Sequence, residues 1–217
     1  MATAKDILIK PIKSHAARAI VKKFHYSGKS TQNSQLHFGV FLNGKLEGAL
    51  QFGPPIDRRR MLPIVKGSKW GDMIELNRMA FGDALPKFSE SRAISVCIRI
   101  IKKNYPQIKW IVSFADGCQC GDGTIYRASG FYLTAINKNK TMLRLPDGRI
   151  VADKALNNSP TKNAGWWKRN GAVPIEGFQL RYIYFIDKEC MEKLQSPVLD
   201  FAEIEKVGAG MYKGEKK

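Results

Sequence analysis

The sequence predicts an α/β fold, in which a mixed β-sheet is flanked by helices. Strand-like and helix-like segments alternate along the chain, and one stretch, Lys109 to Gly130, joins an apolar strand to a glycine-rich turn and a short helix. Its strand, Trp110 to Phe114, leads directly to Asp116. Ligands of α/β proteins bind beyond the carboxyl ends of strands, so Asp116 is the first catalytic candidate. A turn or helix-capping role is the alternative.

The N-terminal segment predicts a strand followed by a helix. Asp6 to Ile12 is strand-like, and Ser14 is expected to cap a helix whose apolar residues recur at helical spacing. The helix is expected to stop near Gly28, which suits a C-terminal cap. His25 and Tyr26 therefore lie at a helix end, beside a polar loop.

A β-hairpin and a central strand follow. Gln35 to Leu42 and Lys45 to Phe52 are joined by Asn43-Gly44, a pair that supplies the positive φ angles of a type I′ turn. Met73 to Phe81 is strand-like but mixes polar and apolar residues, so Arg78 needs a bulge or a strand-end position to reach solvent.

Two helices and several strands complete the prediction. Ser89 or Ser91 starts a helix that runs to Asn104, and a short helix ends at Gly130. The remaining strands are expected at Phe131 to Ile136, Thr141 to Leu145 and Gln179 to Ile186.

Two basic segments lie outside these elements. Ile56 to Gly71 carries Arg58, Arg59 and Arg60 with few apolar residues, so we expect a surface excursion that contacts phosphates, a solvated charge run being the alternative. Ala155 to Val173 is basic and aromatic: Trp166 and Trp167 precede Lys168 and Arg169. Aromatic faces beside cations bind unstacked bases, whereas a buried Trp that anchors a loop is the other interpretation.

The charge of the chain indicates a polyanionic partner. Its 217 residues include 36 Lys and Arg against 19 Asp and Glu, a net charge of +17. No apolar stretch approaches the roughly 20 residues that span a bilayer, so nucleic acid is favoured over membrane. High solubility is the simpler explanation of such a charge.

The cysteines predict a reduced, cytoplasmic protein. Cys97, Cys118, Cys120 and Cys190 come without an apolar N-terminal signal segment. Cys118 and Cys120 have no second pair at zinc-site spacing, so a structural zinc is not expected.

Several motifs in the same order resemble the Mom family of phage DNA-modification proteins, within the GNAT acetyltransferase superfamily. The matching segments are FHYSGK from Phe24, ELNRMAF from Glu75, SESRAIS from Ser89, and SFADG followed by GDGTIYRASGF from Ser113. The resemblance covers roughly Ile7 to Phe185 and implies a GNAT-like fold: a mixed, twisted sheet of about six to seven strands. In that fold the strands at Met73 to Phe81 and Lys109 to Phe114 splay apart.

The resemblance also implies an activity. Mom proteins convert the N6 amine of adenine in phage DNA to an N6-carbamoylmethyl amine, which protects the DNA from host restriction in the cytoplasm of the infected bacterium. Carried over by motif, the candidate catalytic residues are Asp116, Tyr126, Arg78 and Ser91. In the family His25 and Tyr26 are linked to iron. Double-stranded DNA becomes the expected partner.

The chain departs from the superfamily at the donor site. GNAT enzymes hold the pyrophosphate of acetyl-CoA in an Arg/Gln-x-x-Gly-x-Gly/Ala loop at a helix N-terminus, but only Gly82 follows Arg78 before that helix. Carbamoylmethyl is an isomer of glycyl, so a glycine-derived donor such as glycyl-tRNA supplies every atom. Acetyl-CoA lacks the nitrogen, and only that route obviously calls for iron, for which His25 and Tyr26 are a thin ligand set.

The chemistry assigns a role to each candidate. Asp116 is expected to be the general base for N6, and the turn after it is expected to bring Tyr126 back over it as a proton donor or orienting group. Arg78 and Ser91 are expected to hold donor phosphate or carbonyl oxygens.

Adenine N6 lies inside the duplex, so the base must be flipped out. Aromatic residues are expected to stack on it and cations to grip the phosphates; they are Phe24, Tyr26, Trp166, Trp167, Arg58, Arg59, Arg60, Lys168 and Arg169.

Residues 1–190 are predicted to form the catalytic domain, with inserts at 56–71 and 155–173, and 191–217 a polar tail. An ordinary acetyl-CoA-dependent N-acetyltransferase and a non-catalytic DNA-binding protein are the alternative functions. No oligomeric state is predicted.

Overall fold

The computed structural model describes residues 2–212 and 214–216, which form two compact units. The first unit contains the chain up to Phe114 together with Gly123–Ala135 and Arg181–Leu199. The second contains Ala115–Asp122, Ile136–Leu180 and the chain from Asp200 onward.

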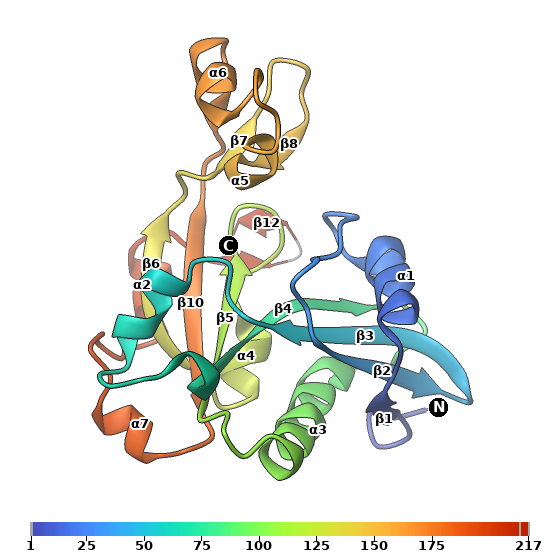
Figure 1. The fold of residues 1–217 in the computed structure, drawn as a ribbon. Helices are drawn as coiled ribbons and strands as arrows, with labels where there is room; N and C mark the ends of the chain where they lie inside the picture. Colours follow the sequence, from blue (N-terminus) through green and yellow to red (C-terminus); the bar gives the residue numbers. More distant parts are fainter. Residues whose placement is uncertain (1, 213, 217) are drawn as a thin grey trace. The chain divides into compact units, whose positions relative to one another are not determined.

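A seven-stranded mixed sheet forms the first unit, as the sequence predicts (Figure 1). Its first three neighbouring strand pairs are antiparallel, and the central pair, β4 with β5, is parallel. Three strands, β5, β6 and β10, continue along the chain into residues of the second unit. In spatial order the strands are β1 (Leu8–Pro11), β2 (Leu36–Leu42), β3 (Lys45–Gly53), β4 (Met73–Phe81), β5 (Trp110–Asp116), β10 (Phe178–Phe185) and β6 (Tyr132–Lys138).

The parallel strands β4 and β5 pair only at their beginnings. The ladder joins Met73 to Trp110 and ends with Glu75 opposite Val112, and no later pair between these strands is found among the described residues. Beyond that point the Ser113 hydroxyl donates to the Leu76 carbonyl at 3.3 Å. The parting of the two strands agrees with the expected splay.

The predicted hairpin turn is confirmed. Asn43 has φ 49° and Gly44 has φ 79°, so both central residues are left-handed. Glycine adopts this conformation without steric cost, and asparagine tolerates it better than most residues. The turn sets the β2–β3 register that places His37 opposite Gln51.

Helices α1 (Ser14–Phe24) and α3 (Ser89–Asn104) lie on opposite faces of the sheet (Figure 1). From α1, Ala17 and Val21 pack against Ala49 and Ala80. The prediction that Ser14 caps α1 is wrong, because the cap is Lys13, whose side chain makes no capping hydrogen bond.

The basic segment 56–71 is not the surface excursion that its charges suggest. It forms α2 (Arg58–Met61), η1 (Leu62–Ile64) and η2 (Trp70–Asp72). Met61, Ile64 and Val65 are buried in a cluster with Trp110. Leu62 and Trp70 pack against the same cluster, so five apolar residues hold the segment to the core. Its arginines stay exposed.

The second unit contains two small sheets. In the first, β7 (Met142–Arg144) lies between β8 (Ile150–Ala152) and β9 (Val173–Pro174), and α5 (Asp153–Leu156) and α6 (Ala164–Arg169) complete what we call the small module, residues 142–174. The second sheet pairs β11 (Met211–Tyr212) with β12 (Glu215–Lys216).

The expected polar tail is partly structured. Residues 191–217 contain α8 (Ala202–Lys206), which follows α7 (Glu189–Glu192), and the β11–β12 hairpin. Ile204 and Met211 are buried, which the high polarity of this stretch concealed. Within the part of the chain that the structure describes, no helix has the length and hydrophobicity required to traverse a bilayer.

Candidate active site

Asp116 is the last residue of β5, and its carboxylate accepts hydrogen bonds from Cys118, Gln119 and Gln179 within the second unit. Oδ1 accepts from the Cys118 backbone N–H at 3.0 Å and from Nε2 of Gln179 at 2.9 Å. Oδ2 accepts from Nε2 of Gln119 at 3.1 Å. These contacts use Asp116 only as an acceptor, as fits an ionised carboxylate, and they fix its direction.

Sequence reasoning missed both glutamines. Gln119 lies three residues after Asp116 in the same turn, so a polar residue at this spacing was the available signal. Gln179 is 63 residues away along the chain, and only the pairing of strands brings it to Asp116.

The thiols beside Asp116 are held protonated. Burial, and next the charge of Asp116, raise the pKa of Cys118 to about 12. The same two causes raise the pKa of Cys120. Because the thiolate is the nucleophilic form, neither side chain is a nucleophile at neutral pH.

Strand β4 of the first unit contains a β-bulge at Asn77, next to Arg78. Gln51 of β3 is opposite Arg78, the next residue Phe52 is opposite Leu76, and Asn77 is the extra residue. With this bulge the Arg78 side chain is partly exposed, as expected from the sequence for a bulge or a strand end. Its Nη1 donates to the Asn77 carbonyl at 2.7 Å and its Nε to the Lys29 carbonyl at 3.1 Å, so Arg78 ties the polar loop after α1 to the bulge.

Polar side chains are buried next to this bulge. Gln51 is fully buried and Asn77 is 6% exposed, and Ser34 donates to Oδ1 of Asn77 at 3.1 Å. Among the residues described, Oε1 of Gln51 and Nδ2 of Asn77 have no hydrogen-bond partner. An unpaired buried polar atom costs about 1–3 kcal/mol, so such atoms concentrate where function requires them.

The start of α3 offers helix amides but no glycine cradle. The amide of Gly82 donates to the Glu47 carbonyl at 2.8 Å, and a Cβ at Gly82 would lie 2.8 Å from the Phe24 ring. Gly82 therefore serves packing. The Ser91 hydroxyl donates to the Phe88 carbonyl at 3.2 Å. The glycine-rich loop that holds the pyrophosphate of acetyl-CoA in its usual pose is therefore not present before α3.

Tyr126 lies in α4 (Thr124–Ala128) of the first unit, where its side chain is buried. Its ring centroid is 5.2 Å from that of Tyr182 and 5.4 Å from that of Phe131. A Cβ at Gly123 would collide with Tyr182, which explains the glycine before α4. Tyr126 thus has a packing role that the motif alone did not reveal.

His25 and Tyr26 follow α1, with their rings stacked at 4.3 Å. Nδ1 of His25 contacts the Ser27 hydroxyl at 2.8 Å. Over residues 2–212 and 214–216, no three His, Cys, Asp or Glu side chains gather as metal ligands. One imidazole and one phenol do not make the His-carboxylate set of a non-haem iron site, so the residues do not fit the iron that the resemblance implied.

The three arginines of α2 differ in their surroundings. Arg58 stacks on the Trp70 ring at 3.6 Å, and Arg60 pairs with Asp57 at 3.4 Å. Arg59 is exposed. All three belong to the first unit.

Trp166 and Trp167 belong to α6 of the small module and are half-buried. They meet edge to face with centroids 5.0 Å apart. Trp167 packs against the buried cluster of Leu145, Val151 and Ala172. Over the Trp166 ring lies Nζ of Lys162, 5.2 Å from the ring centroid. The anchoring interpretation therefore applies to Trp167, and base stacking stays a prediction for Trp166.

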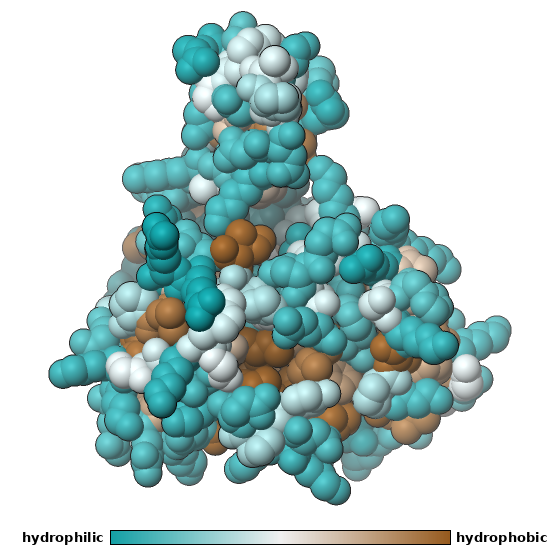
Figure 2. Space-filling view, viewed as in Figure 1, coloured by the Kyte–Doolittle hydropathy of each residue, from teal (hydrophilic) through white to brown (hydrophobic). Residues whose placement is uncertain are grey.

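The surface around Trp166 is strongly basic. Lys168 and Arg169 are exposed, and Ile136–Leu180 contains eight Lys and Arg against three Asp and Glu. Figure 2 shows a mostly hydrophilic surface over the small module on the face in view.

Comparisons with known proteins agree with this architecture. The Mom protein family matches residues 6–203. A relative from Escherichia phage Mu, named methylcarbamoylase mom, is 32% identical over 200 residues, which are 89% of this chain and 81% of the relative. A probable acetyltransferase from Staphylococcus epidermidis has a similar fold, with a TM-score of 0.50 and 11% identity over 83% of this chain and 99% of that protein.

The fold is thus that of GNAT acetyltransferases. In this chain β4 parts from β5 after Glu75, and β4 carries the bulge at Asn77. The family match spans most of both units. The chain belongs to the Mom protein family.

Proposed function

We propose that the protein is a transferase that converts adenine N6 in phage DNA to N6-carbamoylmethyladenine and so protects the DNA from restriction. The observation that carries this proposal is the phage Mu relative, which is named methylcarbamoylase mom and which aligns over 81% of its own length. The net charge of +17 supports duplex DNA as the substrate.

Asp116 is the proposed general base. The N6 lone pair is delocalised into the ring, so the amine must lose a proton as its new bond to carbon forms. A directed carboxylate at a strand end suits this task, and the bonds from Gln119 and Gln179 keep its direction constant. The Cys118 thiol, with its raised pKa, leaves the proton transfer to Asp116.

The donor is proposed to bind in the first unit, at the bulge of β4 and the start of α3. Arg78 positions the bulge through the Asn77 carbonyl, and the first turn of α3, with Ser91, offers N–H groups to an anion. The occupied amide of Gly82 argues against acetyl-CoA in its usual pose. A glycine-derived donor such as glycyl-tRNA is proposed because glycyl is an isomer of the transferred group. Tyr126 stays a proposed orienting residue.

DNA is proposed to bind through exposed cations and through Trp166. Arg59, Lys168 and Arg169 are exposed, and the half-buried Trp166 offers a ring for an unstacked base. Base flipping costs a few kcal/mol, which stacking offsets. Tyr26, 50% exposed, is a second stacking candidate.

A second function, acetyl transfer from acetyl-CoA to an amine, is favoured by the fold that the chain shares with a probable acetyltransferase. One experiment separates the two. Cells that express the protein are grown with ¹³C- and ¹⁵N-labelled glycine, and nucleosides from their DNA are analysed by mass spectrometry. A deoxyadenosine that gains both labels in a carbamoylmethyl group supports the proposal and the glycine-derived donor. An acetylated deoxyadenosine or unmodified DNA would reject it.

A further inference from the structure

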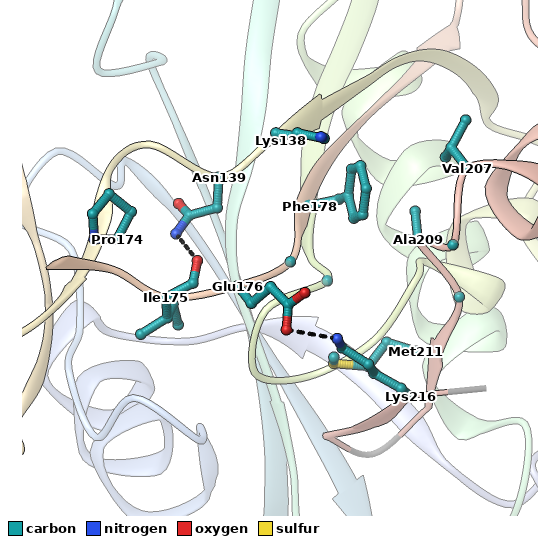
Figure 3. A pocket seen from close by; sticks show the side chains of 14 residues that line it. Lys138, Asn139, Pro174, Ile175, Glu176, Phe178, Val207, Ala209, Met211 and Lys216 are labelled. Carbon is teal, nitrogen blue, oxygen red and sulfur yellow. Dashed lines mark hydrogen bonds and ion pairs between the residues drawn. The ribbon is translucent and has the colours of Figure 1, made fainter.

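The second unit contains a cavity of about 430 Å³ that the proposed transfer reaction does not use. Its walls come from the end of β6, from the segment that leads into β10, and from the chain after α8 (Figure 3). Pockets for small ligands range from about 300 to 1,000 Å³, so this one accommodates a single nucleotide. We infer that the cavity binds one unpaired nucleotide, with the base against Phe178 and the phosphate at Lys138.

The cavity borders the turn after Asp116, because Gly117 lines it, but Asp116 itself is not among the lining residues. Phe178 and Gln179 are consecutive residues of β10, so their side chains point to opposite faces of the strand. Gln179 donates to Asp116, whereas Phe178 lines the cavity. A nucleotide in this cavity is therefore not the adenine that Asp116 would deprotonate, and the inference stands without the transfer reaction.

The cavity carries a positive charge that suits a phosphate. Lys138 is exposed at its edge, and Lys216 pairs with Glu176 at 2.8 Å. The hydrogen bond from Lys216, and next its charge, lower the pKa of Glu176. The carboxylate and one lysine neutralise each other, which leaves Lys138 as the cation for an anionic ligand.

The side chain of Asn139, also in the wall, already makes hydrogen bonds within the protein. Nδ2 of Asn139 donates to the carbonyls of Met142 and Ile175, each at 2.8 Å. Its Oδ1 accepts from the backbone N–H groups of Thr141 and Met142. Asn139 therefore holds the wall in shape, and Lys138 is left to recognise charge.

An apolar surface suited to a base faces Lys138. Figure 3 shows the Phe178 ring between Lys138 and the segment that carries Val207 and Ala209. Val207 is 47% exposed, so its side chain is accessible to a ligand in the cavity. Gly208 and Gly210 add wall without side chains, which admits a planar group close to the backbone. Stacking on one aromatic ring stabilises a bound base by about 1–3 kcal/mol.

The test measures binding of four probes to the full-length protein by isothermal titration calorimetry: AMP, dAMP, adenosine and ribose 5-phosphate. AMP or dAMP is expected to bind, and the two together tell an RNA from a DNA source. Adenosine and ribose 5-phosphate, which each lack one half of the contact, are expected to bind at least ten-fold more weakly.

Variants locate the site. Phe178→Leu keeps an apolar side chain but removes the flat ring, and Lys138→Gln removes the charge; each is expected to weaken nucleotide binding about ten-fold. Lys140→Gln changes an exposed lysine two residues further on that does not line the cavity, and is expected to bind like the unmodified protein. Circular dichroism confirms folding of each variant.

Three outcomes would overturn the inference. They are the absence of AMP and dAMP binding at millimolar concentration, binding that Phe178→Leu and Lys138→Gln leave unchanged, and equal affinity for ribose 5-phosphate and AMP, which would make the cavity a simple anion site.

Discussion

Nε2 of Gln179 donates to Oδ1 of Asp116 at 2.9 Å across two strands that are distant in the sequence. The same amide lies 3.6 Å from the Cys118 sulfur. Gln179 thus connects the carboxylate at the end of β5 to the turn that follows it. The proposed mechanism needs this carboxylate in one orientation, so Gln179 is expected to be a positioning residue.

Replacing Gln179 tests that role. Gln179→Leu removes the hydrogen bond that Nε2 of Gln179 donates to Asp116, and a bond to a charged group is worth about 1.5–3 kcal/mol. We expect kcat for DNA modification to fall at least ten-fold while KM for DNA changes little, as for a lost transition-state interaction. Gln107→Leu, an exposed site on the same residue type, is the control. An unchanged kcat in a folded Gln179→Leu variant would remove Gln179 from the site.

The raised pKa of Cys118 predicts that the stability of the fold depends on pH. Burial raises the pKa of Cys118 from its ordinary value of 9.0 to about 12 in the folded protein. The folded state therefore holds a proton between pH 9 and 12 that the unfolded chain has lost. Stability from this group is fully present below pH 9 and declines as the pH rises above it. Denaturant titrations at pH 8 and 10 measure the decline, which is expected to be smaller in Cys118→Ser.

The same shift predicts an unreactive thiol. Iodoacetamide at pH 7.5, where an ordinary thiol is partly ionised, is expected to label Cys118 only after denaturation. Cys118→Ser is expected to retain DNA modification. Rapid labelling of the native protein, read by peptide mass spectrometry, would contradict the assigned protonation state.

Trp166 and Trp167 are expected to differ when replaced. Trp167→Ala opens space beside Leu145, Val151 and Ala172, and for this half-buried ring we expect about 2 kcal/mol lower stability of the small module, below the 3–5 of fully buried tryptophans. Trp166→Ala is expected to keep the fold and weaken DNA modification. Thermal denaturation and the modification assay are measured on both variants. A stable but inactive Trp167→Ala variant would reverse these assignments.

Exposed cations predict the salt dependence of DNA binding. Arg59→Gln, Lys168→Gln and Arg169→Gln each remove one charge from an exposed position. If the side chain contacts a phosphate, the slope of log K against log salt falls by about 0.9. Lys45→Gln, in the β2–β3 hairpin, provides the same charge change as a control. Slopes equal to that of the unmodified protein would exclude the residue from the interface.

Local signals made the main elements predictable. Asn43-Gly44 specified the hairpin turn, and the mixed polarity of Met73–Phe81 called for a bulge or a strand end at Arg78, of which the bulge at Asn77 is found. The apolar spacing after Ser89 defined α3. In each case a short stretch of chain contains the whole physical cause.

Other features depend on contacts between distant segments. The arginines at 58–60 concealed the burial of Met61, Ile64 and Val65, because three consecutive charged residues mark the segment as surface. Ile204 and Met211 anchor a stretch that composition marks as a tail. The amide of Gln179 reaches Asp116 only through strand pairing, so no window of sequence could identify it.

The central claim is that Asp116 deprotonates adenine N6 for transfer of a carbamoylmethyl group. The most direct measurement is the yield of carbamoylmethyl-deoxyadenosine, by nucleoside mass spectrometry, in DNA from cells that express the unmodified protein, Asp116→Asn or the exposed-site control Asp147→Asn. The proposal predicts modified deoxyadenosine with the unmodified protein and the control, and a loss of about 10²–10⁴ in rate for equally abundant Asp116→Asn. Equal modification by Asp116→Asn would contradict the account.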